Sequence, residues 1–198
     1  MKQGLVVLIA IFIFASCDSK KTKEATSVTD TKTTTKEKET TIPETIDTIV
    51  VYWQTNFDTI SKTEAVHIGN DKHQLLLKSY SLNDSAVVRI NTGNSPRIYK
   101  DIYHNYVTEV ILTKDTDTIL NTMLTKETFQ DSLHIEEFRN YALWGGAEYD
   151  FIRSNRLYFK GSFNYPDTDW LIGNRFAIFY RTEKKNQIDS WNYEDIGL

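Results

Sequence analysis

Residues 156–163 read RLYFKGSF, and this stretch decides the fold class. In an extended chain Leu157, Phe159 and Phe163 fall on one face, and Tyr158 and Lys160 fall on the other. Strict period two of this kind is typical of an antiparallel strand with one face buried and one face in water. We therefore predict a half-buried strand here.

Two other stretches alternate in the same way. RFAIFYR, at 175–181, collects Phe176, Ile178 and Tyr180 on one face, and SAVVRI, at 85–90, collects Ala86, Val88 and Ile90. β-branched and aromatic residues are dense from residue 46 onward, and Gly and Pro are scarce, which favours strands. We expect the apolar face of each stretch to be buried.

Turn residues lie between these strands. Asn83-Asp84 predicts a hairpin between 74–82 and 85–90, KDTD at 114–117 predicts a second, and YPDTD at 165–169 a third. Gly173-Asn174 lies too close to the last turn to form another, so it predicts a bulge in the final long strand.

One segment has helical spacing instead. Thr125 can cap a helix that begins at KETF, and Trp144-Gly145-Gly146 would end the helical region, as glycine does at helix ends. We predict one or two short helices near 126–142, with about four strands before them and two or three after. The fold class is therefore mainly β: a single antiparallel β domain, sandwich or barrel-like. The absence of alternating βαβ units argues against a parallel sheet.

The N-terminus has the features of a secretory signal. Lys2 precedes an apolar run of ten residues, 5–14, which is shorter than the roughly 20 residues that a membrane span needs. Ala15 and Ser16 lead directly to Cys17, the single cysteine of the chain. This resembles a bacterial lipoprotein signal, although Phe14 stands where such signals usually have Leu. An ordinary signal peptide followed by a chance cysteine, or a buried N-terminal strand, are the alternatives.

The resemblance implies lipidation of Cys17, with residues 1–16 removed as the signal peptide. Two or more acyl chains would anchor the protein stably in a membrane. A lipidated Cys17 would leave no thiol for a disulfide or for a metal site, and we expect no cofactor. Asp18 is followed by Ser19 and two lysines rather than by an acidic run, which favours a periplasm-facing location in the bacterial cell envelope.

Residues 17–45 would then hold the lipidated cysteine and a tether. The segment is rich in Thr, Lys and Glu, it lacks aromatic residues, and it cannot bury enough surface to offset the cost of ordering it. Taut, the 27 residues 19–45 reach roughly 90 Å, and as a coil they span about 30 Å. The segment predicts a disordered spacer between the membrane and the globular domain 46–198.

The domain 46–198 carries 16 basic and 21 acidic residues, a net charge near −5, and shows no basic stripe. A nucleic-acid partner is therefore not expected. Its length suits one domain that buries about 70% of its unfolded surface.

Several motifs in the second half of the chain are similar to those of a known family. TKETF at 125–129, then LYFKGSF, PDTDW at 166–170 and a final alternating strand resemble Bacteroidota envelope lipoproteins that carry a domain of unknown function. The resemblance covers about the last half of the chain and the lipoprotein start. It implies a location in the envelope and no particular chemistry.

The loop NYPDTDW offers one candidate metal site. Asn164, Asp167 and Asp169 are oxygen ligands at short spacing, as calcium sites use, but the glycine and distal Glu of an EF-hand are missing. The favoured interpretation is that Asp167 and Asp169 bond to backbone amides of their own turn, with no metal. Calcium is the weaker alternative.

Catalytic motifs are weaker still. Glu148 and Asp150, two apart, would share one face of a strand and could in principle work as a carboxylate pair on a sugar. Such pairs are common on exposed strands, so we assign no catalytic residue. The four histidines have no metal-ligand spacing.

Aromatic residues are the remaining candidates for a binding site. Trp53, Tyr103, Trp170 and Trp191 could bind a sugar ring or anchor a protein interface, and the alternative is that they form core. The sequence thus favours a membrane-tethered, non-enzymatic binding or structural accessory whose partner is a glycan or an envelope protein. A glycan- or cell-wall-acting hydrolase that uses carboxylates is the alternative.

Overall fold

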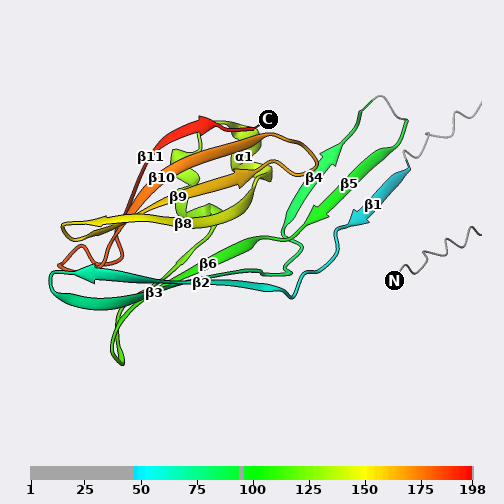
Figure 1. Cartoon of the computed structure of the whole chain (residues 1–198). Coiled ribbons are helices and arrows are strands. Elements are labelled where there is room, and N and C mark those ends of the chain that lie inside the picture. Colours follow the sequence, from blue (N-terminus) through cyan, green and yellow to red (C-terminus); the bar gives the residue numbers. More distant parts are fainter. Residues whose placement is uncertain (1–46, 94–95, 198) are drawn as a thin grey trace, which may run out of the picture. The chain divides into compact units, whose positions relative to one another are not determined.

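The computed structural model describes residues 47–93 and 96–197 (Figure 1). All of them belong to one compact unit, Glu44–Leu198. The predicted signal peptide, Cys17 and the whole of the predicted tether lie outside the described residues. Neither helix in the described ranges is long and apolar enough to cross a membrane.

The chain is mainly β, as predicted. The strands and helices, in order, are β1 (Thr48–Tyr52), β2 (Thr59–Ile68), β3 (Asp71–Ser81), β4 (Val87–Asn91), β5 (Ile98–Tyr103), β6 (Tyr106–Lys114), β7 (Asp117–Leu124), the 3-10 helix η1 (Lys126–Ser132), α1 (Glu136–Tyr141), β8 (Leu143–Arg153), β9 (Arg156–Asn164), β10 (Leu171–Phe179) and β11 (Ile188–Asp195). Both short helices fall in the predicted segment. Seven strands precede the helices and four follow, so the sequence estimate of strand number was too low.

The strands form three sheets. Two have four strands, in the orders β2-β3-β6-β7 and β11-β10-β9-β8, and the third has three, in the order β1-β5-β4. The four-stranded sheets are antiparallel throughout. In the small sheet β1 runs parallel to β5, and this is the one parallel pair among the described strands.

The core lies where the two four-stranded sheets and the helices meet. Its centre is aromatic: the Phe129 ring lies 5.0 Å from Trp144, 5.7 Å from Phe163 and 5.1 Å from Phe176, measured between ring centroids. Trp144 Nε1 donates to Thr108 Oγ1 at 3.0 Å, so the buried indole of one sheet is fixed to the other. Aliphatic residues from both sheets complete the core: Leu75, Leu77, Val110, Leu112, Leu120, Leu124, Leu157 and Ile178.

Two of the three predicted hairpins are confirmed. Asp115, with φ 52°, turns the chain between β6 and β7, and Asp167, with φ 60°, does so between β9 and β10. The bulge at Gly173-Asn174 is also confirmed, because the β10–β11 register shifts between Gly173 and Arg175. The chain does not reverse at Asn83-Asp84: it continues from β3 into β4 beside β6 and β5, with Ser81 opposite Tyr106 and Val87 opposite Tyr103. The predicted hairpin is therefore wrong.

One further prediction, the end of the helical region, is corrected. Gly145 and Gly146 lie inside β8 rather than ending a helix, since α1 stops at Tyr141. Gly145 is close-packed, because a Cβ there would lie 2.4 Å from Ser162 Oγ, and Gly146 has φ +109°, which other residues rarely adopt.

The burial of two alternating strands also differs from expectation. In β4 the buried side chain is Val87, and Ile90 on the supposedly buried face is exposed, because the opposite face packs against the β9–β10 loop. In β10 both faces are buried. Phe179, on the second face, lies under the Arg156 guanidinium at 4.3 Å. Long cationic side chains cover apolar rings in this way.

Candidate functional site

Three of the four aromatic residues singled out from the sequence meet in one cavity. The cavity has a volume of about 480 Å³ and is lined by Trp53, Tyr103, Trp170, Leu143, Asn164 and residues 165–169. We call it the aromatic hollow. Its residues come from the end of β1, the end of β5, the start of β8 and the β9–β10 loop, so residues more than a hundred positions apart converge.

Trp53 is fixed on one side of the hollow by its backbone and by ring stacking. Its N–H donates to the Ile102 carbonyl at 2.9 Å, and its ring stacks on Tyr103 at 5.2 Å with 24° between the planes. The side chain remains 46% exposed, whereas the ring of Tyr103 is buried. One face of Trp53 is therefore supported from below while the indole remains available to a ligand.

His104 holds the Trp53 backbone from behind. Its Nδ1 accepts the Ser85 N–H at 3.0 Å, so in the neutral ring the proton is on Nε2, which lies 3.1 Å from the Trp53 carbonyl oxygen and donates to it. His104 is buried. Its role here is to position the chain.

The β9–β10 loop forms the opposite side of the hollow. Tyr165 N–H donates to the Trp170 carbonyl at 3.0 Å, and the Thr168 hydroxyl both donates to the Tyr165 carbonyl at 2.9 Å and accepts the Trp170 N–H at 3.1 Å. The Trp170 ring meets Phe138 of α1 edge-on at 4.6 Å. Thr168 therefore makes the local turn bonds that were predicted for Asp167 and Asp169.

Asp167 instead ties the loop to the small sheet. Its carboxylate accepts a short hydrogen bond from the Tyr103 hydroxyl, and Arg89 Nη2 lies 4.0 Å from it. Arg89 also donates to the Pro166 carbonyl at 2.6 Å and lies 3.9 Å from Asp101. Burial, and then the hydrogen bond to Asp167, raise the pKa of Tyr103 well above the ordinary tyrosine value. The expectation of purely local bonding is thus wrong for Asp167.

The calcium alternative receives no support from this arrangement. The Asp167 carboxylate is occupied by Tyr103 and Arg89, and Asp169 makes no side-chain hydrogen bond in the described part of the chain. Among the described residues no three His, Cys, Asp or Glu side chains are grouped closely enough to hold a metal ion.

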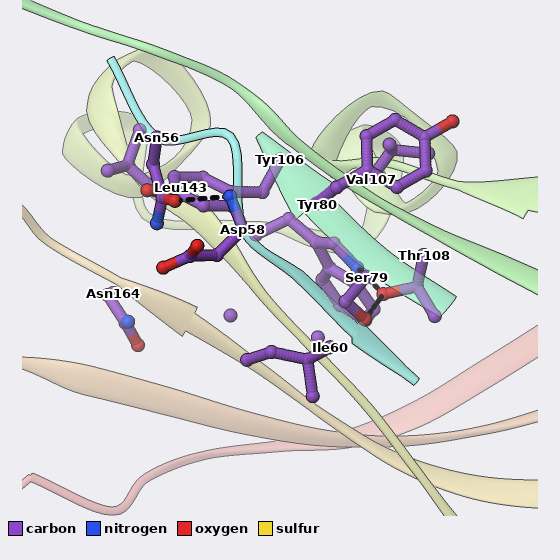
Figure 2. Close-up of a pocket in the computed structure, with 13 residues that line it drawn as sticks. Asn56, Asp58, Ile60, Ser79, Tyr80, Tyr106, Val107, Thr108, Leu143 and Asn164 are labelled. Carbon is purple, nitrogen blue, oxygen red and sulfur yellow. Dashed lines mark hydrogen bonds between the residues drawn. The ribbon is translucent and has the colours of Figure 1, made fainter. Parts of the chain in front are cut away.

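Two more cavities continue from the hollow along β8, and we call them together the edge groove. The first, of about 380 Å³, shares Leu143 and Asn164 with the hollow. The second, of about 480 Å³, shares Ile60, Ser79 and the two glycines of β8 with the first. Figure 2 shows Asp58, Ile60 and Asn164 around the first cavity, where Asp58 N–H donates to Asn56 Oδ1 at 2.8 Å.

The other candidates lie elsewhere. Trp191, on β11, contacts the Tyr158 ring at 6.0 Å and does not line the hollow or the groove. Asp150 pairs with Arg175 at 3.6 Å, while Glu148 lines the second cavity of the groove. A register shift between Tyr149 and Phe151 disturbs the regular strand on which the predicted carboxylate pair depended.

Sequence reasoning missed the residues of the edge groove. Asp58 and Ile60 lie in a stretch with no recognised motif, and Gly145 and Gly146 were assigned to a helix end. The one available signal was the apolar content of 50–60, which carries Trp53, Phe57 and Ile60. The structure leaves Phe57 84% and Ile60 66% exposed.

Comparison with known proteins gives a family and no activity. A search of curated proteins finds no significant match to the chain. The profile of one family matches residues 42–182, which is most of the chain and nearly all of the folded part. The chain therefore belongs to the family described as a domain of unknown function, DUF4738.

Proposed function

We propose that this protein is a lipid-anchored lipoprotein of the bacterial cell envelope whose β domain is a non-enzymatic binding module. The observation that carries the binding function is the aromatic hollow, where Trp53 and Trp170 lie on two sides of one cavity. Concave sites lined by aromatic side chains with a few polar groups are the usual form of ligand sites. Asn164 and Asp169 supply such polar groups here.

The anchoring part of the proposal rests on the N-terminal sequence, Ala15-Ser16-Cys17 after a short apolar run. In cells that express the protein, Cys17→Ala should abolish incorporation of labelled fatty acid and release the mature form from the membrane fraction. The wild-type protein is the control. Mature Cys17→Ala protein that remained membrane-bound would contradict lipid anchoring.

The binding part is tested with defined ligand panels. Immobilised mature protein is screened against oligosaccharides of the cell envelope and against a library of random peptides, and hits are titrated by tryptophan fluorescence. Trp53→Ala and Trp170→Ala should each weaken binding at least tenfold, since buried aromatic anchors carry most of the affinity at such sites. Trp191→Ala, which lies outside the hollow, is the matched control.

Two results would count against the hollow. A hit that binds Trp53→Ala and Trp170→Ala as tightly as the wild type would place the binding site elsewhere. Screens of both panels without any specific hit would contradict a binding function. Periplasmic exposure is tested separately: an externally added protease should reach residues 19–45 only after the outer membrane is permeabilised.

A further inference from the structure

Strand β8 has an edge without a partner strand. It stands at one end of the order β11-β10-β9-β8 and, among the described strands, pairs only with β9 (Figure 1). The free edge of such a strand presents N–H and C=O groups that can pair with another extended chain.

The edge groove runs alongside this edge, and its second cavity also extends over β8 to Lys160, Gly161 and Ser162 of β9. Residues 143–146 of β8 line its first cavity and residues 145–148 line the second, four consecutive residues each time. Because neighbouring residues of a strand point to opposite faces, a space touched by all of them lies beside the strand. By contrast, β2 and the residues before it contribute every second residue, Asp58, Ile60 and Lys62, and so form a wall.

The usual devices that block an edge are weak along this part of β8. Leu143–Glu148 contains no proline and a single charge, Glu148. A bulge between Trp144 and Gly146 distorts the start of the strand, but the register with β9 is regular from Gly146 to Tyr149. Gly145 and Glu148 are exposed and Gly146 and Ala147 are half-buried, so part of this main chain is accessible to solvent. Natural edges normally carry more protection than this.

The walls of the second cavity give the chemistry of the occupant. Lys62 on β2 and Lys160 on β9 both line it, and neither makes an ion pair with any described residue. Glu148 is the one carboxylate in that lining, which leaves a net positive charge. A carboxylate on the ligand would complement it. The other end of the groove opens to the aromatic hollow, which suits a large apolar side chain.

We infer that the ligand is an extended peptide segment that adds a strand to the free edge of β8. Its main chain pairs with Gly146 to Glu148, an acidic side chain lies between Lys62 and Lys160, and an apolar side chain occupies the hollow. In this mode main-chain hydrogen bonds supply affinity and alternate side chains supply specificity. The inference rests on the proposed function, because it takes the hollow to be part of the binding site.

The test uses random ten-residue peptides displayed on phage and selected on the immobilised mature protein. Selected peptides should share an apolar and an acidic residue. Synthetic copies are then methylated at one backbone nitrogen at a time. Methylation at alternate positions should weaken binding roughly tenfold, because each lost main-chain bond leaves a strand group unpaired, and methylation at the intervening positions should have little effect.

Charge reversal tests whether an acidic side chain of the peptide lies between Lys62 and Lys160. The double variant Lys62→Glu/Lys160→Glu should weaken binding of the acidic peptides at least tenfold and should select peptides with a basic residue instead. Lys185→Glu, an exposed lysine outside the groove, is the control and should behave as wild type.

The outcomes separate this inference from the proposed function. Peptides that require Trp53 but tolerate methylation at every nitrogen would overturn strand addition and leave the hollow as the binding site. Saccharide hits that require Trp53, with no peptide hits, would do the same. Binding that is insensitive to Trp53→Ala would overturn the proposed function itself.

Discussion

Replacing Tyr103 by phenylalanine removes one hydroxyl from beneath the hollow, and the loss of stability should depend on pH. The hydroxyl donates to Asp167, and hydrogen bonds to a charged group contribute about 1.5 to 3 kcal/mol when they are well shielded. The Asp167 side chain is 37% exposed, so water replaces part of the interaction. We expect Tyr103→Phe to lower the free energy of unfolding by about 1 to 2 kcal/mol at pH 8.

The pH dependence follows from the raised pKa of Tyr103. Because the folded-state pKa lies above the ordinary value of about 10, the unfolded chain releases the phenolic proton first. The contribution to stability is therefore complete below about pH 10 and is lost as the pH rises toward the folded-state value. In this pH window the release of one proton by the unfolded chain alone lowers the free energy of unfolding by about 1.4 kcal/mol per pH unit. Solvent around Asp167 reduces it, so we expect a relative loss of about 1 kcal/mol between pH 9.5 and pH 11.

Urea unfolding followed by far-UV circular dichroism at pH 8, 9.5 and 11 measures both the stability lost in Tyr103→Phe and the change of that loss with pH. The stability gap between wild type and Tyr103→Phe should narrow at pH 11, since only the wild type has this proton to lose. Tyr80 and Tyr149 also have a raised pKa, but both remain in the two proteins and their effects cancel. Tyr158→Phe, on a different surface, is the control. A gap that stays constant from pH 8 to pH 11 would refute the assigned role of the Tyr103–Asp167 bond.

Three further predictions concern the tether, the loop and the core. Limited trypsin digestion should cut within 19–45 and leave a stable fragment that begins near residue 46, as judged by mass spectrometry; protection of that segment would show that it packs on the domain. Excess calcium should leave the melting temperature unchanged, and a rise of several degrees that is lost in Asp167→Asn/Asp169→Asn would establish a metal site. Phe129→Ala should cost about 3 to 5 kcal/mol in urea unfolding, and a loss below about 1 kcal/mol would contradict the central place of this ring in the core.

Local patterns predicted the local structure well. The period of two in 156–163 identified β9 with the correct buried face, and the Asp-containing turns at 114–117 and 165–169 identified two real hairpins. These features depend on interactions between residues a few positions apart, which the sequence displays directly. The helical segment near 126–142 was found for the same reason.

Pairing between distant strands was not predictable in this way. The turn residues Asn83-Asp84 predicted a reversal, but pairing with the distant strands β6 and β5 carries the chain on from β3 into β4 without one, so β4 was assigned to the wrong neighbour. The exposure of Ile90 was mispredicted for the same reason, because the burial of each face of β4 depends on which elements pack against it. Gly145 was wrongly assigned to a helix end. A glycine is needed there because the main chain approaches Ser162 on another strand closely.

The candidate site shows the same limit. Trp53, Tyr103 and Trp170 were identified one at a time as aromatic candidates, and only the fold shows that they share a cavity while Trp191 does not. Asp167 was recognised as a turn residue. Its partners Tyr103 and Arg89 lie 64 and 78 positions away, and no short pattern could reveal them.

The pairing of β1 with β5 has a consequence for how the binding surface is assembled. Thr48 lies opposite Ile98, fifty positions along the chain, whereas most strands of the larger sheets meet their neighbours in sequence. Closing so long a loop costs more entropy, and contacts of this kind form late and open early. In native-state hydrogen exchange the amides of β1 should therefore lose protection at a lower free energy than those of β9 and β10. Trp53 follows β1 directly, so the domain would complete its core before it completes its site.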